Sequence, residues 1–356
     1  MKLDKVQEEI VNSTESKILV IAGSGSGKTR VLTERIKALV EKGENPTKIV
    51  AITFTNAAAA EMKERLGEIG NKVFIGTIHS YANRLLLTEG IDTSEYINDE
   101  KFDRLFDEIR RNLETFPEIN HLLVDEFQDI DDNQYDFFQL LEPKNYFYIG
   151  DDYQNIYGWR GANIEHFYNL FHNEETTVYM MANNYRTAKN IVKYANSFIS
   201  RIEDKIVKRV RCLIDKGDVI HLKKFDKEFI SNYIKGDKKY GEWFVLTRTN
   251  AQISLIMDFL NSEGIPCDTF KKSELDSDEL KQKLKENTVK VLTVHSAKGL
   301  ENDKVIVLGV TPYTEEECRV AYVAATRAKS LLIWIHSLAA PKKYTKYLDS
   351  NVMNWE

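Results

Sequence analysis

A glycine-rich stretch near the N-terminus, AGSGSGKT at residues 22–29, has the residue types and spacing of a phosphate-binding loop. It follows an apolar run and opens a helical one, so the backbone N–H groups of Gly23 to Gly27 would meet phosphate at the positive end of a helix. Lys28 would reach the β- and γ-phosphates, and the Thr29 hydroxyl would ligate Mg²⁺. The generic pattern begins with glycine, and Ala22 stands in its place. A glycine-rich turn without a nucleotide is therefore the competing interpretation.

Two adjacent carboxylates follow another apolar run, in HLLVDEFQD at residues 121–129. Asp125 would belong to the Mg²⁺ shell, while Glu126 would orient and deprotonate an attacking water. An acidic residue directly after the metal-holding aspartate favours hydrolysis over transfer to a small molecule. A solvated acidic loop is the alternative interpretation of such a pair.

Two segments in the second half of the chain carry arginines suited to sensing phosphate. NNYRT puts Tyr185 and Arg186 at a predicted strand–helix junction. In EEECRVAYVAATRAK, residues 315–329, Arg319 and Arg327 stand at positions i and i+8, which predicts that both lie on one helix face. An arginine that reaches the γ-phosphate accelerates phosphoryl transfer. Taken singly, each of these would be interpreted as an ordinary surface arginine.

GDDYQNIYGWRGA, residues 150–162, gathers two carboxylates, a Gln, two Tyr, a Trp and an Arg directly after an apolar run. Such a segment is compatible with a loop capped by its own side chains, with an aromatic interface, or with a site that touches two ligands at once. Asp151 and Asp152 fit either turn caps or support for the metal site.

The elements that must position these residues are short β-branched runs alternating with helical periodicity. This alternation indicates parallel sheets covered by helices on both faces. The strand-like runs are residues 17–23, 48–54, 73–79, 121–126, 146–150, 176–182, 217–225, 243–249, 289–296, 304–310 and 331–336. Asn56 is expected to be the N-cap of the helix after the second run.

The strands are too many for one comfortable sheet, and a helix near 187–200 makes a natural crossing point. We therefore predict two α/β lobes in tandem, residues 1–184 and 185–356, with a cleft between them. Residues 87–117 are charged and helical and interrupt the first lobe as a small insertion. Residues 270–288 form a polar, helical connector in the second lobe.

Length and composition agree with this organisation. The 356 residues fit about two domains of roughly 150 residues. The net charge of −6 argues against a basic coat for nucleic acid, but not against a local groove with a few cations and aromatic rings. Cys212, Cys267 and Cys318 form no CxxC pair, which argues against a zinc ribbon, an iron–sulfur cluster or a disulfide scaffold. No apolar run suits a signal peptide or a membrane span, so we expect a cytoplasmic protein.

Ten motifs occur in an order that resembles superfamily 1 helicases of the UvrD/Rep/PcrA type, and the resemblance covers nearly the whole chain. They are Gln7, AGSGSGKT, ITFTNAAAAEMKERL, GTIHS, LVDEFQD, GDDYQNIYGWRGA, NYRT, VLTRTNAQ, TVHSAKGLE and YVAATRAK. In the family, TFTN usually continues with a lysine, whereas this chain runs TFTNAAAA. Members of the family also carry larger helical insertions in both lobes.

The resemblance implies two tandem RecA-like P-loop NTPase lobes, with ATP and Mg²⁺ bound in the cleft between them. It assigns ATP binding to Gln7, Ala22, Gly23, Ser24, Gly25, Ser26, Gly27, Lys28, Thr29, Arg30, Tyr185 and Glu301. Gln7 would read the adenine edge, Tyr185 would stack on the adenine ring, and Glu301 would reach the ribose. The catalytic residues would be Lys28, Glu126, Gln154, Arg186 and Arg327, the last three at the γ-phosphate. Thr29 and Asp125 would hold the metal.

The resemblance also implies a path for single-stranded DNA. It would be lined by Phe54, Thr77, His79, Tyr157, Trp159, Arg160 and His295. Stacking on aromatic rings would let an acidic protein hold DNA without reading its sequence. Packing at strand ends is the alternative for Phe54 and His79. In GDDYQNIYGWRGA, Tyr157 and Trp159 would face the bases and Gln154 the γ-phosphate, and Arg160 would join the two ends through a carboxylate.

The function implied is an ATP-dependent 3′-to-5′ translocase and helicase, monomeric alone, acting on single-stranded DNA and on junctions of single- and double-stranded DNA. The alternative is a nucleotide-gated subunit that regulates a partner nuclease or a replication, repair or defence complex and unwinds weakly alone. A small-molecule kinase on a P-loop fold would leave the arginines of the second lobe and the aromatic segment without a role.

Overall fold

The computed structural model describes residues 2–98, 103–112, 116–215, 217–336 and 354–355. These residues group into two compact units, which we call the N-unit and the C-unit. The N-unit comprises residues 2–23, 27–152 and 157–181. The C-unit comprises the chain from residue 182 onward together with two short segments, Ser24–Ser26 and Tyr153–Ile156.

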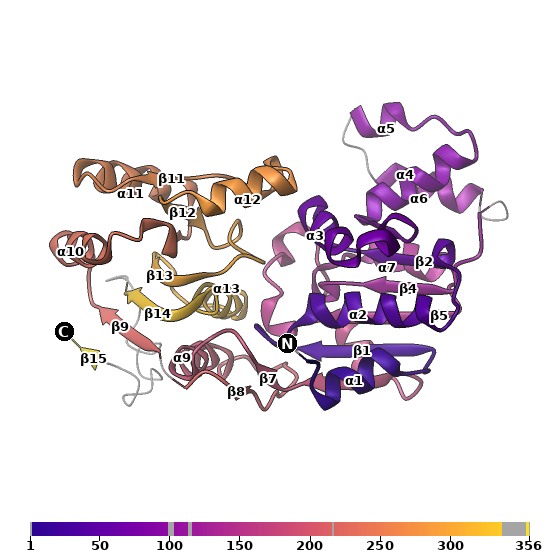
Figure 1. Ribbon diagram of the computed structural model, residues 1–356, viewed down its shortest axis with the longest axis horizontal. Helices are drawn as coiled ribbons and strands as arrows, with labels where there is room; N and C mark the ends of the chain where they lie inside the picture. Colours follow the sequence, from indigo (N-terminus) through magenta and orange to yellow (C-terminus); the bar gives the residue numbers. More distant parts are fainter. Residues whose placement is uncertain (1, 99–102, 113–115, 216, 337–353, 356) are drawn as a thin grey trace. The chain divides into compact units, whose positions relative to one another are not determined.

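The N-unit is built on a six-stranded sheet in which every pair of neighbouring strands is parallel (Figure 1). Its strand order is β3-β2-β4-β5-β1-β6. The strands are β1 Lys17–Ala22, β2 Ile49–Ile52, β3 Phe74–Gly76, β4 His121–Val124, β5 Asn145–Gly150 and β6 Thr177–Met181. Its helices are α1 Lys5–Asn12, α2 Lys28–Glu41, α3 Asn56–Leu66, α4 Ile78–Thr88, α5 Ser94–Asn98, α6 Asp103–Arg111, α7 Asp132–Leu140 and α8 Glu165–His172.

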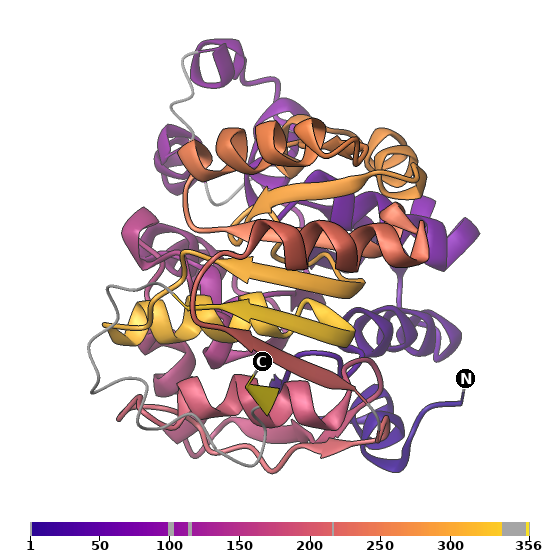
Figure 2. The same ribbon diagram turned by 90° about the vertical axis from the view of Figure 1, so that its left-hand side faces the viewer.

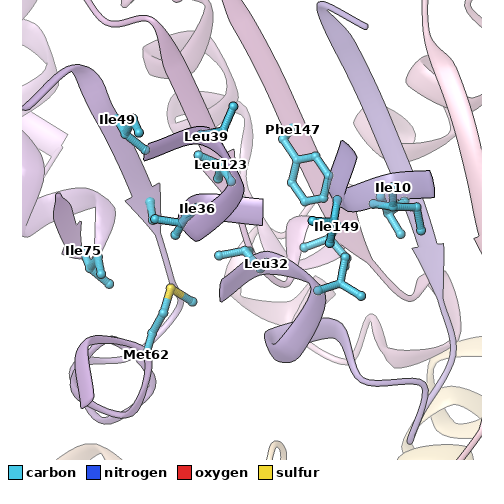
Figure 3. Close-up of a cluster of buried hydrophobic side chains, with 14 of the residues drawn as sticks. Ile10, Leu32, Ile36, Leu39, Ile49, Met62, Ile75, Leu123, Phe147 and Ile149 are labelled. Atoms are coloured by element: carbon cyan, nitrogen blue, oxygen red, sulfur yellow. The ribbon is translucent and has the colours of Figure 1, made fainter. Parts of the chain in front are cut away.

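Alternate residues of a strand point to the same side of a sheet. On one side of this sheet they pack against side chains of α1, α2 and α3. Figure 3 shows Ile10, Leu32 and Met62 of these helices packed with strand residues such as Leu123 and Ile149. Aromatic side chains pack on the opposite face. The centroid of the Phe127 ring lies 4.2 Å from that of Tyr148 and 6.1 Å from that of Phe167.

The C-unit has a seven-stranded sheet in the order β11-β12-β10-β13-β14-β9-β15, again wholly parallel. Figure 2 shows strands of this sheet side by side. They are β9 Asp218–Leu222, β10 Trp243–Thr247, β11 Cys267–Asp268, β12 Val289–Thr293, β13 Asn302–Leu308, β14 Ala328–Ile335 and β15 Asn354–Trp355. A separate parallel pair joins β7 Asn183–Asn184 to β8 Arg211–Cys212. The helices are α9 Lys189–Ile199, α10 Lys227–Asp237, α11 Asn250–Ser262, α12 Ser277–Lys285 and α13 Glu315–Ala325.

Helices cover both faces of this second sheet as well. Ile234 of α10 and Leu260 of α11 pack in one cluster with strand residues such as Val291. On the other face, Tyr194 and Phe198 of α9 contact the ring of Trp334 at centroid distances of 5.5 and 5.0 Å. The predicted fold class, α/β with parallel sheets in two units, is therefore confirmed.

Two predicted element boundaries are wrong for the same reason, a threonine that caps a helix. The strand-like run 73–79 ends at Gly76, because Thr77 accepts a hydrogen bond from the Ser80 N–H (3.2 Å) and starts α4. The helix after β2 is capped by Thr55, whose hydroxyl oxygen accepts from the Ala58 N–H (3.2 Å), and not by Asn56. In both cases the extended backbone of the threonine suits the cap position.

The two segments predicted as an insertion and a connector both contain helices. In residues 87–117, α5 and α6 form, and Leu105, Phe106 and Ile109 of α6 are buried. Residues 99–102 and 113–115 lie outside the described residues. In residues 270–288, α12 begins with a capping box between Asp276 and Glu279. Among the described residues, no helix is long and apolar enough to cross a membrane.

Candidate nucleotide and nucleic-acid site

The glycine-rich loop joins β1 to α2, as predicted, with Ala22 as the last residue of the strand and Lys28 as the first of the helix. Gly25 and Gly27 have positive φ angles of 74° and 89°, a conformation that side chains other than glycine rarely adopt. Gly27 caps α2 without any side-chain hydrogen bond to the helix. The first backbone N–H groups of α2, at the positive end of the helix, are thus suited to bind an anion.

The two adjacent carboxylates stand at the end of β4. Asp125 is buried, and its Oδ1 accepts a hydrogen bond from the Glu126 N–H (2.9 Å). Burial, and next the Glu126 carboxylate, raise the pKa of Asp125. The Lys28 ammonium lies 3.7 Å from Glu126 Oε1. A buried carboxylate that is costly to ionise alone is a suitable Mg²⁺ ligand, and a carboxylate and a hydroxyl are the hard oxygen donors that this ion prefers.

Gln128 is a site residue whose role the sequence motifs do not reveal. Its fully buried side chain donates from Nε2 to Glu126 Oε2 (2.6 Å) and accepts at Oε1 from the Asp151 N–H (2.9 Å). A Cβ on Gly150 would lie 2.4 Å from Gln128 Oε1, so only glycine fits beside it. Asp151 and Asp152 are both buried, and the Asp151 backbone is tied by Gln128 to the loop of the proposed base.

Gln7 lies beside the glycine-rich loop. It forms a capping box with Asp4 at the start of α1, with hydrogen bonds of 2.9 and 3.1 Å. A Cβ on Gly27 would lie 3.2 Å from Gln7 Nε2. The buried Arg35 holds the other end of α1 by donating to the carbonyl oxygens of Ile10 (2.8 Å) and Ser13 (3.1 Å). The helix that carries Gln7 is thereby held at both ends.

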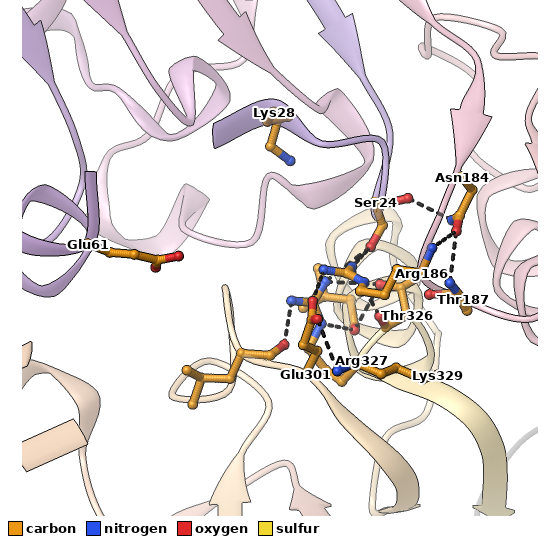
Figure 4. A network of polar contacts seen from close by, with 12 residues as sticks. Ser24, Lys28, Glu61, Asn184, Arg186, Thr187, Glu301, Thr326, Arg327 and Lys329 are labelled. Atoms are coloured by element: carbon orange, nitrogen blue, oxygen red, sulfur yellow. Dashed lines mark hydrogen bonds and ion pairs between the residues drawn. The ribbon is translucent and has the colours of Figure 1, made fainter. Parts of the chain in front are cut away.

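In the C-unit, two predicted arginines converge on one serine of the glycine-rich loop (Figure 4). Arg186 donates to Ser24 Oγ and to the Glu301 carboxylate. Arg327 donates to Ser24 Oγ (3.4 Å) and to the carbonyl oxygen of Leu300 (2.9 Å). The structure therefore brings Ser24, Arg186, Glu301 and Arg327 together. Although burial opposes ionisation of Glu301, the charges of Arg186 and Lys329 hold its pKa below the usual value.

Asn184, the second asparagine of NNYRT, organises this group and was also missed. Its Nδ2 donates to the Ser24 carbonyl (2.7 Å), and its Oδ1 accepts from the backbone N–H of Arg186 (2.9 Å). The Tyr185 N–H donates to the Gly25 carbonyl (2.9 Å), so the half-buried Tyr185 is also attached to the loop. The signal for Asn184 was its place directly before the Tyr–Arg pair.

The prediction that Arg319 and Arg327 share a helix face is wrong. Helix α13 ends at Ala325, and Arg327 lies in the turn between it and β14, so the i+8 spacing does not continue along a helix. Arg319 instead lies 3.8 Å from Glu315 on its own helix.

Four predicted DNA-path residues of the N-unit form one aromatic cluster. The Phe54 and Tyr157 rings stack with centroids 5.2 Å apart, and the Arg160 guanidinium lies 4.8 Å from the Trp159 ring and 5.7 Å from the Tyr157 ring. Trp159 is 61% exposed and Phe54 41%, whereas Tyr157 is only 9% exposed. Tyr157 therefore supports the exposed Phe54 ring by stacking, and Arg160 lies over both Tyr157 and Trp159. Among the described residues no carboxylate pairs with Arg160, so the predicted ion-pair link is wrong and ring contacts take its place.

The remaining predicted DNA-path residues lie elsewhere. Thr77 caps α4, and the half-buried His79 stacks on Phe106 of α6 with ring centroids 5.5 Å apart. In the C-unit, His295 hydrogen-bonds to the Ile156 backbone, and burial, followed by the charge of Arg248, lowers its pKa to about 4. The buried Lys298 donates to the Gln154 carbonyl (2.7 Å) and is a third residue without an assigned role.

Comparison with known proteins shows which family this chain resembles. The sequence profile of the UvrD/REP helicase N-terminal domain matches residues 3–118 and 101–175, and that of the UvrD-like helicase C-terminal domain matches residues 179–275 and 268–338. A relative named ATP-dependent DNA helicase PcrA, from Leuconostoc citreum, is 30% identical over 74% of this chain and 49% of its own length. ATP-dependent DNA helicase Rep from Buchnera aphidicola is 28% identical over 77% of this chain and 58% of its own length.

The chain thus spans about half the length of the curated relatives that it matches. The two profiles follow one another along the chain and together extend from residue 3 to residue 338. The parallel sheets of the two units agree with the tandem RecA-like lobes predicted for such proteins. The chain belongs to the UvrD-like helicase family.

Proposed function

We propose that this chain hydrolyses ATP in response to single-stranded DNA and uses the hydrolysis to move along the strand from 3′ to 5′ and to separate duplexes. The observation that carries the proposal is the pair of arginines, Arg186 and Arg327, that contact Ser24 of the phosphate-binding loop. Guanidinium groups at that position suit the charge that develops on a transferred phosphoryl group.

The proposed nucleotide site uses oxygen ligands for Mg²⁺ and a carboxylate base. Thr29 and Asp125 would hold the ion, which would neutralise phosphate charge when bound. Glu126 would accept the proton of the attacking water. Its position beside Lys28 and Gln128 supports this role, because both groups orient the carboxylate. Gln7 and Tyr185 would contact the adenine.

The proposed DNA site is the exposed part of the aromatic cluster. Trp159 and Phe54 offer ring faces to bases of any sequence. Arg160 would contact the strand beside these rings, and His79 and His295 are further proposed contacts to DNA. The names of the relatives, ATP-dependent DNA helicases, support the same substrates, which would be single-stranded DNA and its junctions with duplex.

The test is strand displacement on duplexes that carry a 3′ or a 5′ single-stranded tail, together with ATP hydrolysis with and without oligothymidine. We expect DNA to stimulate hydrolysis and displacement to require the 3′ tail. Lys28→Ala is the inactive control. Displacement only from the 5′ tail would contradict the polarity. Hydrolysis that is indifferent to DNA would contradict the proposed function.

A further inference from the structure

The segment Tyr153–Ile156 groups with the C-unit, although the chain on either side of it belongs to the N-unit. Before the segment, the Asp151 N–H donates to Gln128 (2.9 Å) in the N-unit. After it, the Tyr157 ring stacks on Phe54 of the N-unit. The chain on either side does not hold these four residues to the C-unit, so noncovalent contacts must do so.

Tyr153 makes three contacts that do so. Its buried hydroxyl donates to the Ile206 carbonyl (2.8 Å). Its ring meets the Tyr322 ring of α13 edge to face, with centroids 5.5 Å apart. The Lys208 ammonium lies 3.4 Å from the centroid of the Tyr153 ring, a cation–π contact. The neighbouring Gln154 is held through its own backbone, which accepts from Lys298.

The segment that contacts Tyr153 leads along the chain to β8, which pairs with the segment that carries Asn184 and Arg186. Ile206 and Lys208 contact Tyr153, and a few residues later β8 pairs with β7. The Leu213 N–H donates to the carbonyl of Asn184 (3.0 Å), the residue that holds Ser24 and aligns Arg186. Residues 206–213 of the C-unit, which we call the 206–213 stretch, therefore contact both Tyr153 and Asn184.

We propose that Tyr153 is a positioning residue that keeps Gln154 attached to the unit that carries Arg186 and Arg327. The inference rests on the proposed function, in which these three side chains contact the γ-phosphate. Its consequence is that Gln154 responds to the nucleotide together with the two arginines, through the 206–213 stretch. Tyr153 itself need not touch the nucleotide.

The experiment compares Tyr153→Phe and Tyr153→Ala with the unaltered chain. Tyr179→Phe is the matched control, because it also removes one tyrosine hydroxyl hydrogen bond (to Ser13 Oγ, 3.1 Å), but within the N-unit. The first readout is hydrogen–deuterium exchange of the amides of residues 154–156 without nucleotide. The second is the ratio of the dissociation constants of ADP and ATPγS, both measured with Mg²⁺ and without DNA.

Loss of one hydrogen bond predicts about fivefold faster exchange and about a fivefold smaller preference for ATPγS over ADP in Tyr153→Phe. Both effects should be larger in Tyr153→Ala, while the ADP dissociation constant stays the same. Tyr179→Phe should match the unaltered chain in both readouts.

Unchanged exchange in both Tyr153 variants would overturn the inference. So would faster exchange with an unaltered preference for ATPγS, because the segment would then be released without consequence for the γ-phosphate. Neither readout uses DNA or turnover. A chain whose hydrolysis ignores DNA would therefore contradict the proposed function while leaving the role of Tyr153 to be decided by these two measurements.

Discussion

At the scale of single residues, Glu126 has a positive φ of 51°, which residues other than glycine seldom adopt. Its carboxylate is contacted by Lys28 on one oxygen and by Gln128 on the other. Such conformations persist only where the surroundings enforce them, and they concentrate at functional sites. This supports the assignment of Glu126 as the base.

Glu126→Gln should therefore remove turnover and leave binding intact. The amide has the shape of the carboxylate but cannot accept a proton, so we expect kcat for ATP to fall by about 10²–10⁴-fold. ATP affinity should stay within a few fold. Steady-state hydrolysis and equilibrium titration check both values. Glu61→Gln, on the exposed surface of α3, is the control and should keep full activity. A Glu126→Gln variant with near-normal kcat would exclude this residue as the base.

Trp159 and Tyr157 are adjacent in the aromatic cluster but should respond differently to truncation. Trp159→Ala exposes no core and removes a stacking face, so affinity for oligothymidine should fall by about 1–3 kcal/mol, roughly 5- to 150-fold, with an unchanged melting temperature. Tyr157→Ala removes a buried ring and should cost about 3–5 kcal/mol of stability. Fluorescence anisotropy and thermal melting separate the two effects. Equal losses of stability would contradict the division into exposed and supporting rings.

At the scale of elements, helix α1 depends on Arg35 of α2. Arg35→Met would remove the guanidinium donor to the carbonyl oxygens of Ile10 and Ser13 and should lower the free energy of unfolding by about 1–3 kcal/mol. If Gln7 reads adenine, the preference for ATP over GTP should fall as well. Urea denaturation and competition binding measure these changes. Arg65→Met, at an exposed i,i+4 pair, should cost less than about 1 kcal/mol.

Sequence patterns predict elements well here because each strand and the phosphate-binding loop are local. β1, the glycine-rich loop and the start of α2 follow one another in the sequence. The apolar runs mark every strand of the six-stranded sheet. Helix starts were less accurate, since Asn56 and Thr55 are both good caps and only backbone geometry distinguishes them. Contacts such as Gln128 to Asp151 or Asn184 to Ser24 join residues 23 and 160 positions apart, which no local pattern encodes.

At the scale of the whole molecule, the two units have separate hydrophobic cores. The C-unit also contains a pair of histidines, the buried His221 and the half-buried His336. His221 Nδ1 lies 3.0 Å from His336 Nε2, and the Tyr194 ring packs against His221. Burial, followed by the neighbouring His336, lowers the pKa of His221 to about 3, and burial lowers the pKa of His336 to about 4.

The C-unit should therefore lose stability in mild acid. The unfolded chain binds protons on these histidines near pH 6.5 and the folded chain does not, so their contribution is complete above about pH 6.5 and declines as the pH falls toward 4. For His221 alone this amounts to about 2 kcal/mol between pH 7 and pH 5. Urea denaturation followed by tryptophan fluorescence reports on this unit, in which Trp243 and Trp334 are buried. His221→Gln should flatten the pH dependence, and an identical slope in that variant would refute the assignment.

The exposed aromatic rings have a further consequence for how the chain would respond to ionic strength. Each phosphate neutralised by a cation releases counterions and steepens the salt dependence of single-strand binding by about 0.7 in the logarithmic slope. Ring stacking on Trp159 and Phe54 releases none, and the chain as a whole carries a charge of −6. Affinity for a DNA strand should accordingly decline only gently with added salt. The protein would then stay bound to single-stranded DNA at salt concentrations that release proteins bound mainly through lysine and arginine.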